Sequence, residues 1–545
     1  QKRGVTDPEI AIAHLIVDTS GEDLPTHYET DRMRFLGRGR TLTEAAAFDA
    51  GAELSNSSGF TMDTCLSLRR TLRVPAGEKV SVTFWTIAAA ERAELEAAVE
   101  HYRQPESFAQ GLVQAWTRTQ SQLRQIGVNS KEAAAYQRFA RYIIYPDMAL
   151  RADNKAVREG LNSQSVLWGA TLSGDAPLMT LRITDELGTD LVKELLRAQG
   201  LLQSRGVEVD LVIFNERAGE AAAEMQRTID QLCDAARHAS EVAGIQRNIY
   251  VLRKDLTTPE AYDAIIAASR VVMRGRDGSL IDQVQKARSV SGSPALLGQW
   301  GDSTLVPRMV RDVAGALPVD GSDLAFWNGY GGFAADGSEY VVRLSGGEQT
   351  PHPWVNIIAN ESFGFHVSAE GAAFTWSQNS RDHQLTPWTN DMVTNRPGEA
   401  FYLKDLDRGS VIVPYASLAQ RADTRFEARH GLGYSVFSTV QDEISLEVTQ
   451  TLDMEKPVKL TQLRIRNDAG EARKLRLYGY AEWILGNNPT KSKPFIISSF
   501  DSASGAVFAK NPFSVSFGTR VAAFAASETP SSVSTSRREF IGRHG

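Results

Sequence analysis

Apolar side chains recur at every second position early in the chain, which is the pattern of half-buried strands. Leucine and valine follow this period in residues 66–74, and valine and phenylalanine follow it in residues 80–84. Successive side chains of a strand point to opposite faces of a sheet, so each stretch predicts one strand. The intervening Pro-Ala-Gly-Glu at 75–78 has the composition of a turn. The pattern therefore predicts an antiparallel hairpin.

The apolar period lengthens near residue 90, where apolar residues recur every three or four positions. This spacing predicts helices over residues 90–102, 108–126 and 131–144. Ser130 has the hydroxyl side chain that commonly caps a helix N-terminus. We therefore expect Ser130 to be the N-cap of the third helix.

Strand and helix patterns then alternate four times. Such alternation predicts a small parallel sheet with right-handed crossovers and with helices on both faces. The second strand is wholly apolar from Leu211, as a strand buried on both faces should be. The predicted strands are 178–183, 207–214, 248–252 and 271–273, and the predicted helices are 190–203, 216–238, 258–268 and 279–287.

A change of composition marks the last part of the chain. Ser, Gly and Pro interrupt the alternation at 289–294, so we place an irregular linker over residues 289–323. Beyond it the sequence is aromatic and strand-like, with a turn signal at 467–470 and with apolar residues on one side of a predicted strand at 444–452. These features predict a large antiparallel sandwich.

A short segment near the start recurs near the end. Residues 30–39 (TDRMRFLGRG) and 535–544 (TSRREFIGRH) share Thr, Arg, Phe, Gly and Arg in register, with Leu in one copy where the other has Ile. A match of this length can arise by chance. The alternative is that the chain opens near the end of one sandwich and closes at the equivalent point of a second, so that both ends are cut edges.

Together the patterns predict a multidomain chain of mixed class. Antiparallel β-sandwich domains lie at both ends, joined by linker helices and a small α/β module with a parallel sheet. The 545 residues suffice for this, since about 150 residues make an average domain. The predicted divisions are 1–105 (the C-terminal part of a first sandwich), 106–175 (helical linker region), 176–288 (α/β module), 289–323 (linker) and 324–545 (second sandwich, incomplete at its end).

Charge and cysteine content exclude several classes of function. Lys and Arg total 59 and Asp and Glu total 66, and this net charge of −7 argues against a nucleic-acid partner. Cys65 and Cys233, far apart in sequence, indicate neither a disulfide framework nor a thiolate metal site and fit a reducing compartment. No stretch reaches about 18 uncharged apolar residues, so we expect no direct membrane insertion by this segment.

Residues 353–391 have the composition of a saccharide-binding surface. Five of the nine tryptophans lie between residues 300 and 388. Aromatic rings stack on the apolar faces of sugars, while amide, guanidinium and carboxylate groups bond their hydroxyls. For four aromatic residues we favour the competing interpretation, which places them in the core of a sandwich. For the polar run 378–391, a functional surface and a merely ordered loop both stay open. The four are Trp354, Phe363, Phe365 and Trp376.

Two further groups of residues are weaker candidates. His383 has no second His or carboxylate at ligand spacing, so we expect a solvated or loop-bonded imidazole. Asp405 and Asp407 share one face of a predicted strand end, as a glycosidase pair does. We favour instead a turn in which these carboxylates pair with Lys404 and Arg408.

The α/β module carries a candidate ligand site at the carboxyl ends of its strands. Residues 215–217 (Asn-Glu-Arg) follow the second strand, and residues 274–279 (RGRDGS) open a helix after the fourth, where an anion can bind. No glycine-rich phosphate-binding motif follows any of these strands. We favour a structural sheet without a ligand, with a nucleotide-sugar site as the alternative.

Four motifs lie close together in the C-terminal part: 354–360 (WVNIIAN), 374–381 (FTWSQNSR), 385–391 (LTPWTND) and 397–403 (PGEAFYL). They resemble the N-terminal β-sandwich, or supersandwich, of the cellobiose and chitobiose phosphorylase family, in the version carried by cyclic β-1,2-glucan synthases. The repeated segments at 32–39 and 537–542 resemble a motif late in that sandwich. Those synthases are also similar in carrying two copies of the sandwich, separated by a helical and α/β stretch.

The resemblance implies a membrane-embedded synthase that builds linear β-1,2-glucan from UDP-glucose, cyclises it, and trims it by phosphorolysis. It places the general acid and the phosphate-binding residues in a helical toroid that follows the second sandwich, beyond Gly545. The helices predicted between residues 90 and 144 are too few to form that toroid. We therefore assign no catalytic residue, no cofactor and no metal site to this chain.

By the same resemblance, a loop of the sandwich contacts saccharide or a neighbouring domain. The residues expected to make these contacts are Arg381, Asp382, Thr386, Trp388, Asn390 and Asp391. His383 and Gln384 depart from the Asn- or Arg-like character expected there, which affects the detailed sugar contacts. The implied partners are a β-1,2-glucan or another β-glucan, the flanking catalytic domains of the same polypeptide, and a second copy in a homodimer. The implied location is the cytoplasmic face of the bacterial inner membrane, as a soluble part of a larger membrane protein.

Our leading hypothesis is a noncatalytic, carbohydrate-binding and domain-organising segment of a cyclic β-1,2-glucan synthase that supports phosphorolytic control of glucan length. One alternative is a nucleotide-sugar-dependent glycosyltransferase that uses the α/β sheet. The other is a pure scaffold that sets the geometry between flanking catalytic domains.

Overall fold

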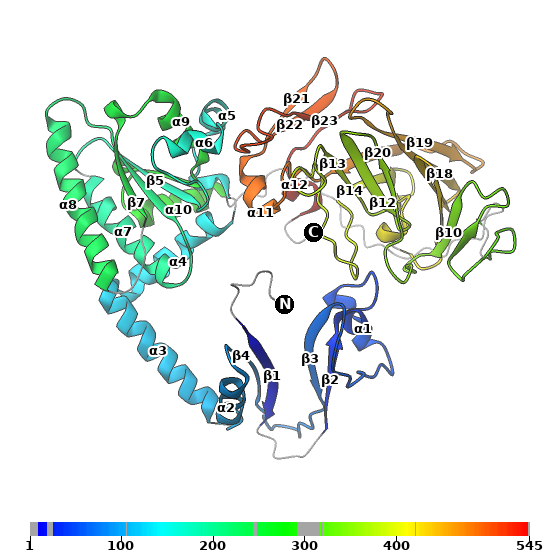
Figure 1. Ribbon diagram of the computed structural model, residues 1–545, viewed down its shortest axis with the longest axis horizontal. Helices are drawn as coiled ribbons and strands as arrows, with labels where there is room; N and C mark the ends of the chain where they lie inside the picture. The colour runs from blue at the N-terminus through cyan, green and yellow to red at the C-terminus, as the bar shows by residue number, and fades with distance from the viewer. Residues whose placement is uncertain are drawn as a thin grey trace.

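The computed structural model describes residues 9–18, 25–104, 106–145, 147–186, 188–242, 248–291, 317, 320–419 and 421–542. Most of the linker predicted at 289–323 lies outside these residues. The fold is of the predicted mixed class, with antiparallel sheets at both ends of the chain and a four-stranded parallel sheet between them (Figure 1). Among the described helices, none is both long enough and apolar enough to cross a bilayer.

The N-terminal part forms two antiparallel strand pairs. β1 (Ala11–Asp18) pairs with β4 (Val82–Ala89), and β2 (Thr26–Asp31) pairs with β3 (Thr64–Arg70). The predicted hairpin over 66–84 is therefore wrong, because its two strands belong to different pairs. The turn signal between them is local, whereas strand partners are selected by side-chain contacts along the whole length of a pair.

Three helices follow as predicted: α2 (Arg92–Tyr102), α3 (Ser107–Ile126) and α4 (Ser130–Ile144). The expected N-cap of α4 is wrong by one residue, because Asn129 is the cap. Its side-chain oxygen accepts hydrogen bonds from the amides of Lys131 and Glu132, at 3.0 and 2.9 Å. The Glu132 carboxylate in turn accepts the Asn129 amide at 2.9 Å. This reciprocal capping box places Ser130 inside the helix.

The parallel sheet has the strand order β7-β6-β5-β8. Its strands are β5 (Leu178–Ile183), β6 (Asp210–Asn215), β7 (Ile249–Arg253) and β8 (Val271–Arg274). The connecting helices are α7 (Gly188–Ser204), α8 (Ala221–Val242), α9 (Pro259–Ala268) and α10 (Leu280–Ser291). Side chains of α4, α7, α8 and α10 form one core on the sheet, and α9 with the short helices α5 (Asn154–Gly160) and α6 (Gln164–Trp168) contributes to the other. The sheet is thus covered on both faces, as predicted.

Four antiparallel sheets share one apolar core in the described C-terminal part. Along β18 (Ile444–Leu452) every second residue is buried, as predicted. The turn predicted at 467–470 connects two different sheets, since β19 (Lys459–Asn467) pairs with β18 while β20 (Leu475–Ala481) pairs with β14. The remaining strands are β9 (Gly331–Phe333), β10 (Tyr340–Ser345), β11 (Val355–Ala359), β12 (Phe363–Ser368), β13 (Ala373–Ser377), β14 (Glu399–Asp405), β15 (Val411–Ile412), β16 (Arg425–Gly431), β17 (Tyr434–Gln441), β21 (Ile497–Asp501), β22 (Ala506–Lys510) and β23 (Ala522–Phe524).

The two copies of the repeated segment have the same local structure. The short helix α1 (Arg32–Leu36) is capped by the Asp31 side chain and ends at Gly37 with a φ of 82°. Its counterpart α12 (Arg537–Ile541) is capped by the Ser536 side chain and ends at Gly542 with a φ of 81°. Such a φ favours glycine, which explains why both copies hold glycine at this point. The shared geometry supports a true repeat over a chance match.

Candidate functional site

The polar run 378–391 begins a long loop between β13 and β14. Its middle is buried, at residues 383–386, whereas residues 378–382 and 388–390 are exposed. The buried part is held by its backbone, because Gln384 forms antiparallel bridges with Trp376 on one side and with Gly486 on the other. The loop therefore offers two separate exposed stretches.

Trp388 belongs to a cluster of rings on the second exposed stretch. Its ring is nearly parallel to that of Phe374, with 5.3 Å between the ring centroids and 8° between the planes. The His366 ring packs edge-on against both rings, at 5.5 and 4.5 Å. Phe374 is buried, whereas Trp388 is 47% exposed. The cluster thus holds a half-exposed indole in a fixed orientation, which suits a flat apolar ligand surface.

A buried ion pair adjoins this aromatic cluster. The Glu399 carboxylate accepts hydrogen bonds from the Thr375 and Thr386 hydroxyls, at 2.6 and 2.7 Å, and pairs with Lys459 at 2.6 Å. Burial acts to raise the pKa of Glu399, but Lys459 and the hydroxyls outweigh it and hold that pKa below its usual value. Burial, with the Lys459 charge, lowers the pKa of His366 to about 4. Near pH 7 the rings around Trp388 are therefore uncharged.

Asp391 is bound by a residue from the N-terminal part of the chain. Arg32 donates one hydrogen bond to each carboxylate oxygen, both at 2.9 Å. The same carboxylate accepts the amides of Val393 and Thr394, at 3.0 and 3.1 Å, and the Thr394 hydroxyl at 2.7 Å. The Arg32 guanidinium outweighs burial and holds the pKa of Asp391 well below its usual range. Asp391 is thus an ionised group that fixes both the loop and its partner segment.

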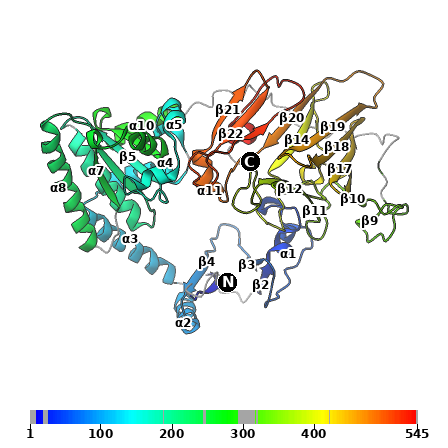
Figure 2. The same cartoon turned by 45° about the horizontal axis from the view of Figure 1, so that its top comes forward.

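Other residues of the first repeat copy extend this contact. Arg38 donates to the carbonyls of Thr350 and Val393, at 3.1 Å each, and to the Glu370 carboxylate at 3.3 Å. Leu36 forms a small apolar cluster with Val393. As a result α1 lies against the C-terminal sandwich (Figure 2).

The structure separates the six residues expected to contact saccharide or a neighbouring domain. Thr386 is buried on Glu399, and Asp391 lies at the contact with α1. The exposed ones are Arg381, Asp382, Trp388 and Asn390. The Asn379 side chain accepts the amides of Arg381 and Asp382, at 2.9 Å each, and so shapes the first exposed stretch. Sugar contact by any of them stays a prediction.

Sequence reasoning did not single out the residues that support this surface. Glu399, Lys459 and His366 come from three different strands, so no local spacing connects them. Arg32 and Arg38 could have been noticed, because both belong to the repeated segment 30–39. The repeat does not indicate which residues these two arginines bind.

His383 is held by its own loop, which is one of the two outcomes expected for it. Its Nδ1 lies 3.0 Å from the Ser377 carbonyl oxygen, and its ring stacks on Phe517 with 4.2 Å between centroids. Burial lowers the pKa of His383. Only 4% of the residue is exposed, so it packs as a neutral core group.

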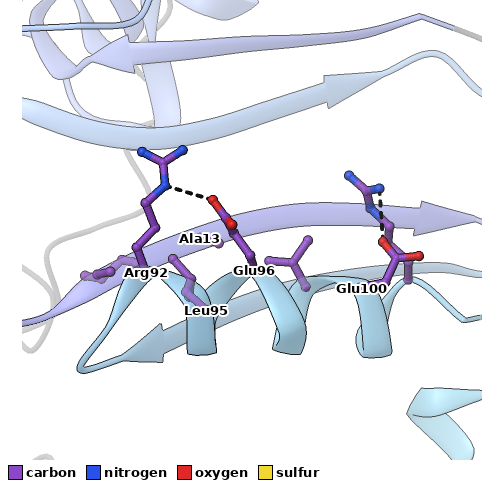
Figure 3. A pocket seen from close by; sticks show the side chains of 9 residues that line it. Ala13, Arg92, Leu95, Glu96 and Glu100 are labelled. Atoms are coloured by element: carbon purple, nitrogen blue, oxygen red, sulfur yellow. Dashed lines mark hydrogen bonds and ion pairs between the residues drawn. The ribbon is translucent and has the colours of Figure 1, made fainter.

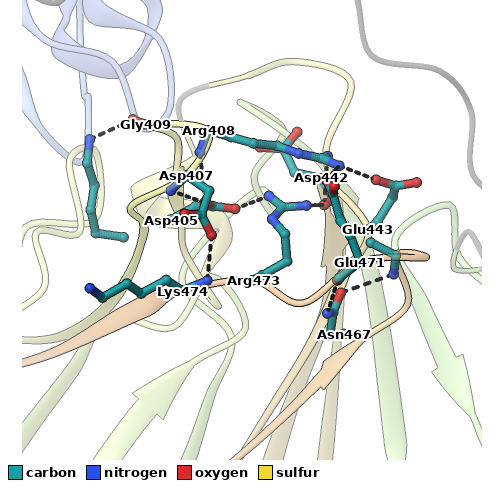
Figure 4. A network of polar contacts seen from close by, with 12 residues as sticks. Asp405, Asp407, Arg408, Gly409, Asp442, Glu443, Asn467, Glu471, Arg473 and Lys474 are labelled. Atoms are coloured by element: carbon teal, nitrogen blue, oxygen red, sulfur yellow. Dashed lines mark hydrogen bonds and ion pairs between the residues drawn. The ribbon is translucent and has the colours of Figure 1, made fainter.

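Asp405 and Asp407 form the expected turn, but with other partners than expected (Figure 4). The buried Asp405 carboxylate pairs with Arg473 and accepts the amides of Asp407 and Arg408 at 2.9 Å each. Asp407 accepts the Lys474 amide at 2.6 Å. The expected pairing with Lys404 and Arg408 is wrong: Lys404 donates to the Gly409 carbonyl and Arg408 pairs with Glu443. Both carboxylates thus stabilise the turn by accepting backbone amides, and Asp405 is closed off from solvent.

The alternative site at the carboxyl edge of the parallel sheet is filled by its own side chains. Arg182 of β5 donates two hydrogen bonds to Glu216, at 2.7 and 3.1 Å, and Tyr262 of α9 donates a third. Asn215 is buried, and its side-chain amide donates to the Ala222 carbonyl at 2.9 Å. A nucleotide-sugar site at this edge stays a prediction.

A surface hollow of about 660 Å³ lies in the N-terminal part, between β1 and α2 (Figure 3). The charged side chains that line it are already paired with each other. Arg92 binds Glu96 at 2.8 Å, and Arg103 binds Glu100 at 3.5 Å. The hollow therefore lacks a free charged group directed at a ligand.

Comparisons with known proteins agree with this fold. The sequence-family model of the glycosyl hydrolase 94 supersandwich domain matches residues 1–105 and 338–545. The cyclic beta-(1,2)-glucan synthase NdvB of Rhizobium meliloti (strain 1021) is 51% identical over 100% of this chain, which spans 19% of that protein. The N,N'-diacetylchitobiose phosphorylase of Vibrio furnissii is 28% identical over 29% of this chain and 20% of its own length. The solabiose phosphorylase of Paenibacillus borealis is 24% identical over 40% of this chain and 28% of its own length. With antiparallel sheets at both matched ends, these findings show that the chain belongs to the glycosyl hydrolase 94 family, whose supersandwich domain it carries.

Proposed function

We propose that this chain is a noncatalytic, carbohydrate-binding and domain-organising segment of a cyclic β-1,2-glucan synthase. The similarity to NdvB along the whole chain supports this class of parent protein. The observation that carries the binding role is the half-exposed Trp388 ring, stacked on Phe374 within the region that matches the supersandwich domain.

The surroundings of Trp388 suit a saccharide. Phe374 already orders the indole, so little side-chain freedom is lost when a sugar ring stacks on its exposed part. Thr389 and Asn390 are exposed next to it and supply hydroxyl and amide groups for sugar hydroxyls. An open surface of this kind desolvates few contacts, so we expect a Kd on the order of 1 mM.

The contacts of Arg32 and Arg38 support the domain-organising role. They connect the N-terminal part that matches the supersandwich model to the C-terminal part that matches it. In this proposal the flanking domains hold the catalytic residues, and the segment keeps glucan close to them and so supports phosphorolytic control of chain length. We expect the parent protein at the cytoplasmic face of the inner membrane, with a homodimer as its assembly and no cofactor in this segment.

The test is a titration of the chain with linear β-1,2-gluco-oligosaccharides, followed by NMR or calorimetry. We expect saturable binding that Trp388→Ala abolishes. The matched control is Trp116→Ala on α3, because Trp116 is 66% exposed and lies in a different part of the fold. Binding by this control should equal that of the unmodified chain.

Absence of binding at millimolar saccharide, in a chain shown to be folded, would favour the pure scaffold instead. Binding that is equally strong in Trp388→Ala would contradict the assigned surface and direct the search to Arg381 and Asp382 on the first exposed stretch.

A further inference from the structure

Two arginine side chains lie where the α/β module contacts the C-terminal sandwich. Arg151, between α4 and α5, donates hydrogen bonds to the carbonyl of Ala267 at 3.0 Å and to the carbonyl of Pro494. Arg270, between α9 and β8, donates to the carbonyls of the last two residues of α4. These partners are uncharged backbone groups, so they leave the charges of both guanidinium groups unbalanced.

Neither guanidinium group has a carboxylate partner in the part of the chain that the structure describes. Both residues are half-buried, and the Arg151 Nε is shielded from solvent without a hydrogen-bond acceptor. Burial and the Arg270 charge lower the pKa of Arg151 to about 10, and burial lowers the pKa of Arg270. Two like charges that have lost solvent and lack a counter-charge are costly, so an anion between them stabilises both.

Both arginines line a hollow of about 10 Å³, whose other walls are Met148, Pro494 and Asp147. A space of this size holds about one water molecule. It therefore suits a monatomic anion, whereas the polyatomic anions sulfate and phosphate are too large. The methionine and proline side chains place apolar atoms around the space, which strengthens the attraction between an anion and a guanidinium group.

Asp147 is the acidic member of this lining, and it is already paired. Its carboxylate binds Arg141 at 2.9 Å and accepts the Ala149 amide at 3.0 Å. The charges of Asp147 and Arg141 balance each other, so the hollow keeps the positive charge of Arg151 and Arg270.

We propose that this hollow is a binding site for a halide ion, chloride, held between the guanidinium groups of Arg151 and Arg270. The ion balances two like charges that the fold places close together. Because Arg151 also binds the Pro494 carbonyl, the occupied site stabilises the contact between the α/β module and the C-terminal sandwich. The site involves no saccharide and goes beyond the proposed function.

The test is chloride NMR of the full chain in NaCl, in which ions that exchange with a protein site broaden the chloride resonance. We expect a saturable broadening that bromide removes by competition and that phosphate at the same ionic strength does not remove. Arg270→Gln should weaken chloride binding at least about tenfold, because a charge-assisted hydrogen bond is lost. The matched control is Arg276→Gln, because Arg276 is 68% exposed, pairs with Asp185 and lies at the other end of β8. This control should bind chloride as the unmodified chain does.

A second variant, Met148→Trp, keeps both arginines and fills the hollow instead. Met148 is 53% exposed, so the surface accommodates the larger side chain, and the broadening should disappear. Thermal unfolding is the second measurement: chloride should raise the Tm of the unmodified chain above its value in gluconate at the same ionic strength, and it should raise the Tm of neither variant. Equal broadening in the unmodified chain and both variants would overturn the proposal. So would competition by phosphate as effective as that by bromide, or a Tm of the unmodified chain that is the same in chloride and gluconate.

Discussion

Arg32 and Asp391, which lie 359 positions apart in the chain, form a two-point ion pair with 2.9 Å between each nitrogen and its oxygen. A planar guanidinium matches a carboxylate in this geometry, and a lysine ammonium does not. The two side chains are 27% and 24% exposed, so water screens the pair less than it screens a fully exposed one. The pair therefore fixes the position of α1 on the C-terminal sandwich.

We expect Arg32→Ala to lower the free energy of unfolding by about 1–3 kcal/mol, because it removes charge-assisted hydrogen bonds and leaves Asp391 without its main partner. Arg32→Lys should recover only part of this loss. Urea denaturation measures both. Arg40→Ala is the control, since Arg40 pairs with Asp49 at 42% and 55% exposure and should cost less than about 1 kcal/mol. Equal losses for Arg32→Ala and Arg40→Ala would contradict the assigned role.

The pH dependence of this contact has a definite sign. The folded-state pKa of Asp391 is depressed, mainly by Arg32. The stability it contributes is therefore fully present above the unfolded pKa, about 4, and is lost as the pH falls below that value toward the folded pKa. The difference in unfolding free energy between the unmodified chain and Asp391→Asn should be constant from pH 7 to about pH 5. It should shrink at lower pH, and a difference that grows on acidification would contradict this account.

Protonation of His366 should lower the free energy of unfolding on acidification, at higher pH values than the protonation of Asp391 does. Its folded-state pKa is about 4, because burial and Lys459 disfavour the charged ring. The unfolded chain, with a histidine pKa of about 6.5, binds the proton more readily between these values, so stability drops as the pH falls from about 6.5 to 4. His366→Phe should reduce the slope of unfolding free energy against pH by at most about 1.4 kcal/mol per pH unit. Denaturant titrations at several pH values measure the slope, and an unchanged slope would contradict the assignment.

The sequence predicts the fold best where a regular pattern reports burial directly. β18 alternates between buried and half-buried residues along its length, and each strand of the parallel sheet is followed by a helix. The hairpin over 66–84 fails because its turn signal is local, whereas β3 and β4 pair with strands that precede them. Local composition reports a reversal of the chain, but it does not report which strands meet.

The candidate site is predicted only in part for the same reason. The aromatic and polar run correctly located an irregular loop, and Trp388 is exposed on it. Thr386 has the same polar character as its neighbours, yet it is buried, because its hydroxyl donates to Glu399 of β14, a carboxylate that pairs in turn with Lys459 of β19. Such partners come from distant parts of the chain, and their pairing depends on packing that one sequence does not encode in any local spacing.

The two carboxylates of the Asp405 turn should respond very differently to neutralisation. Asp405 and Arg473 are both almost completely buried, so Asp405→Asn leaves a buried guanidinium without its counter-charge. We expect a loss of about 3–5 kcal/mol in unfolding free energy. Asp407 is exposed and only accepts the Lys474 amide, which an asparagine oxygen can also accept, so Asp407→Asn should cost less than about 1 kcal/mol. Thermal and urea unfolding of the two variants compare these losses directly. Similar small losses would show that Arg473 finds another partner, and similar large losses would show that the exposed carboxylate is essential to the turn.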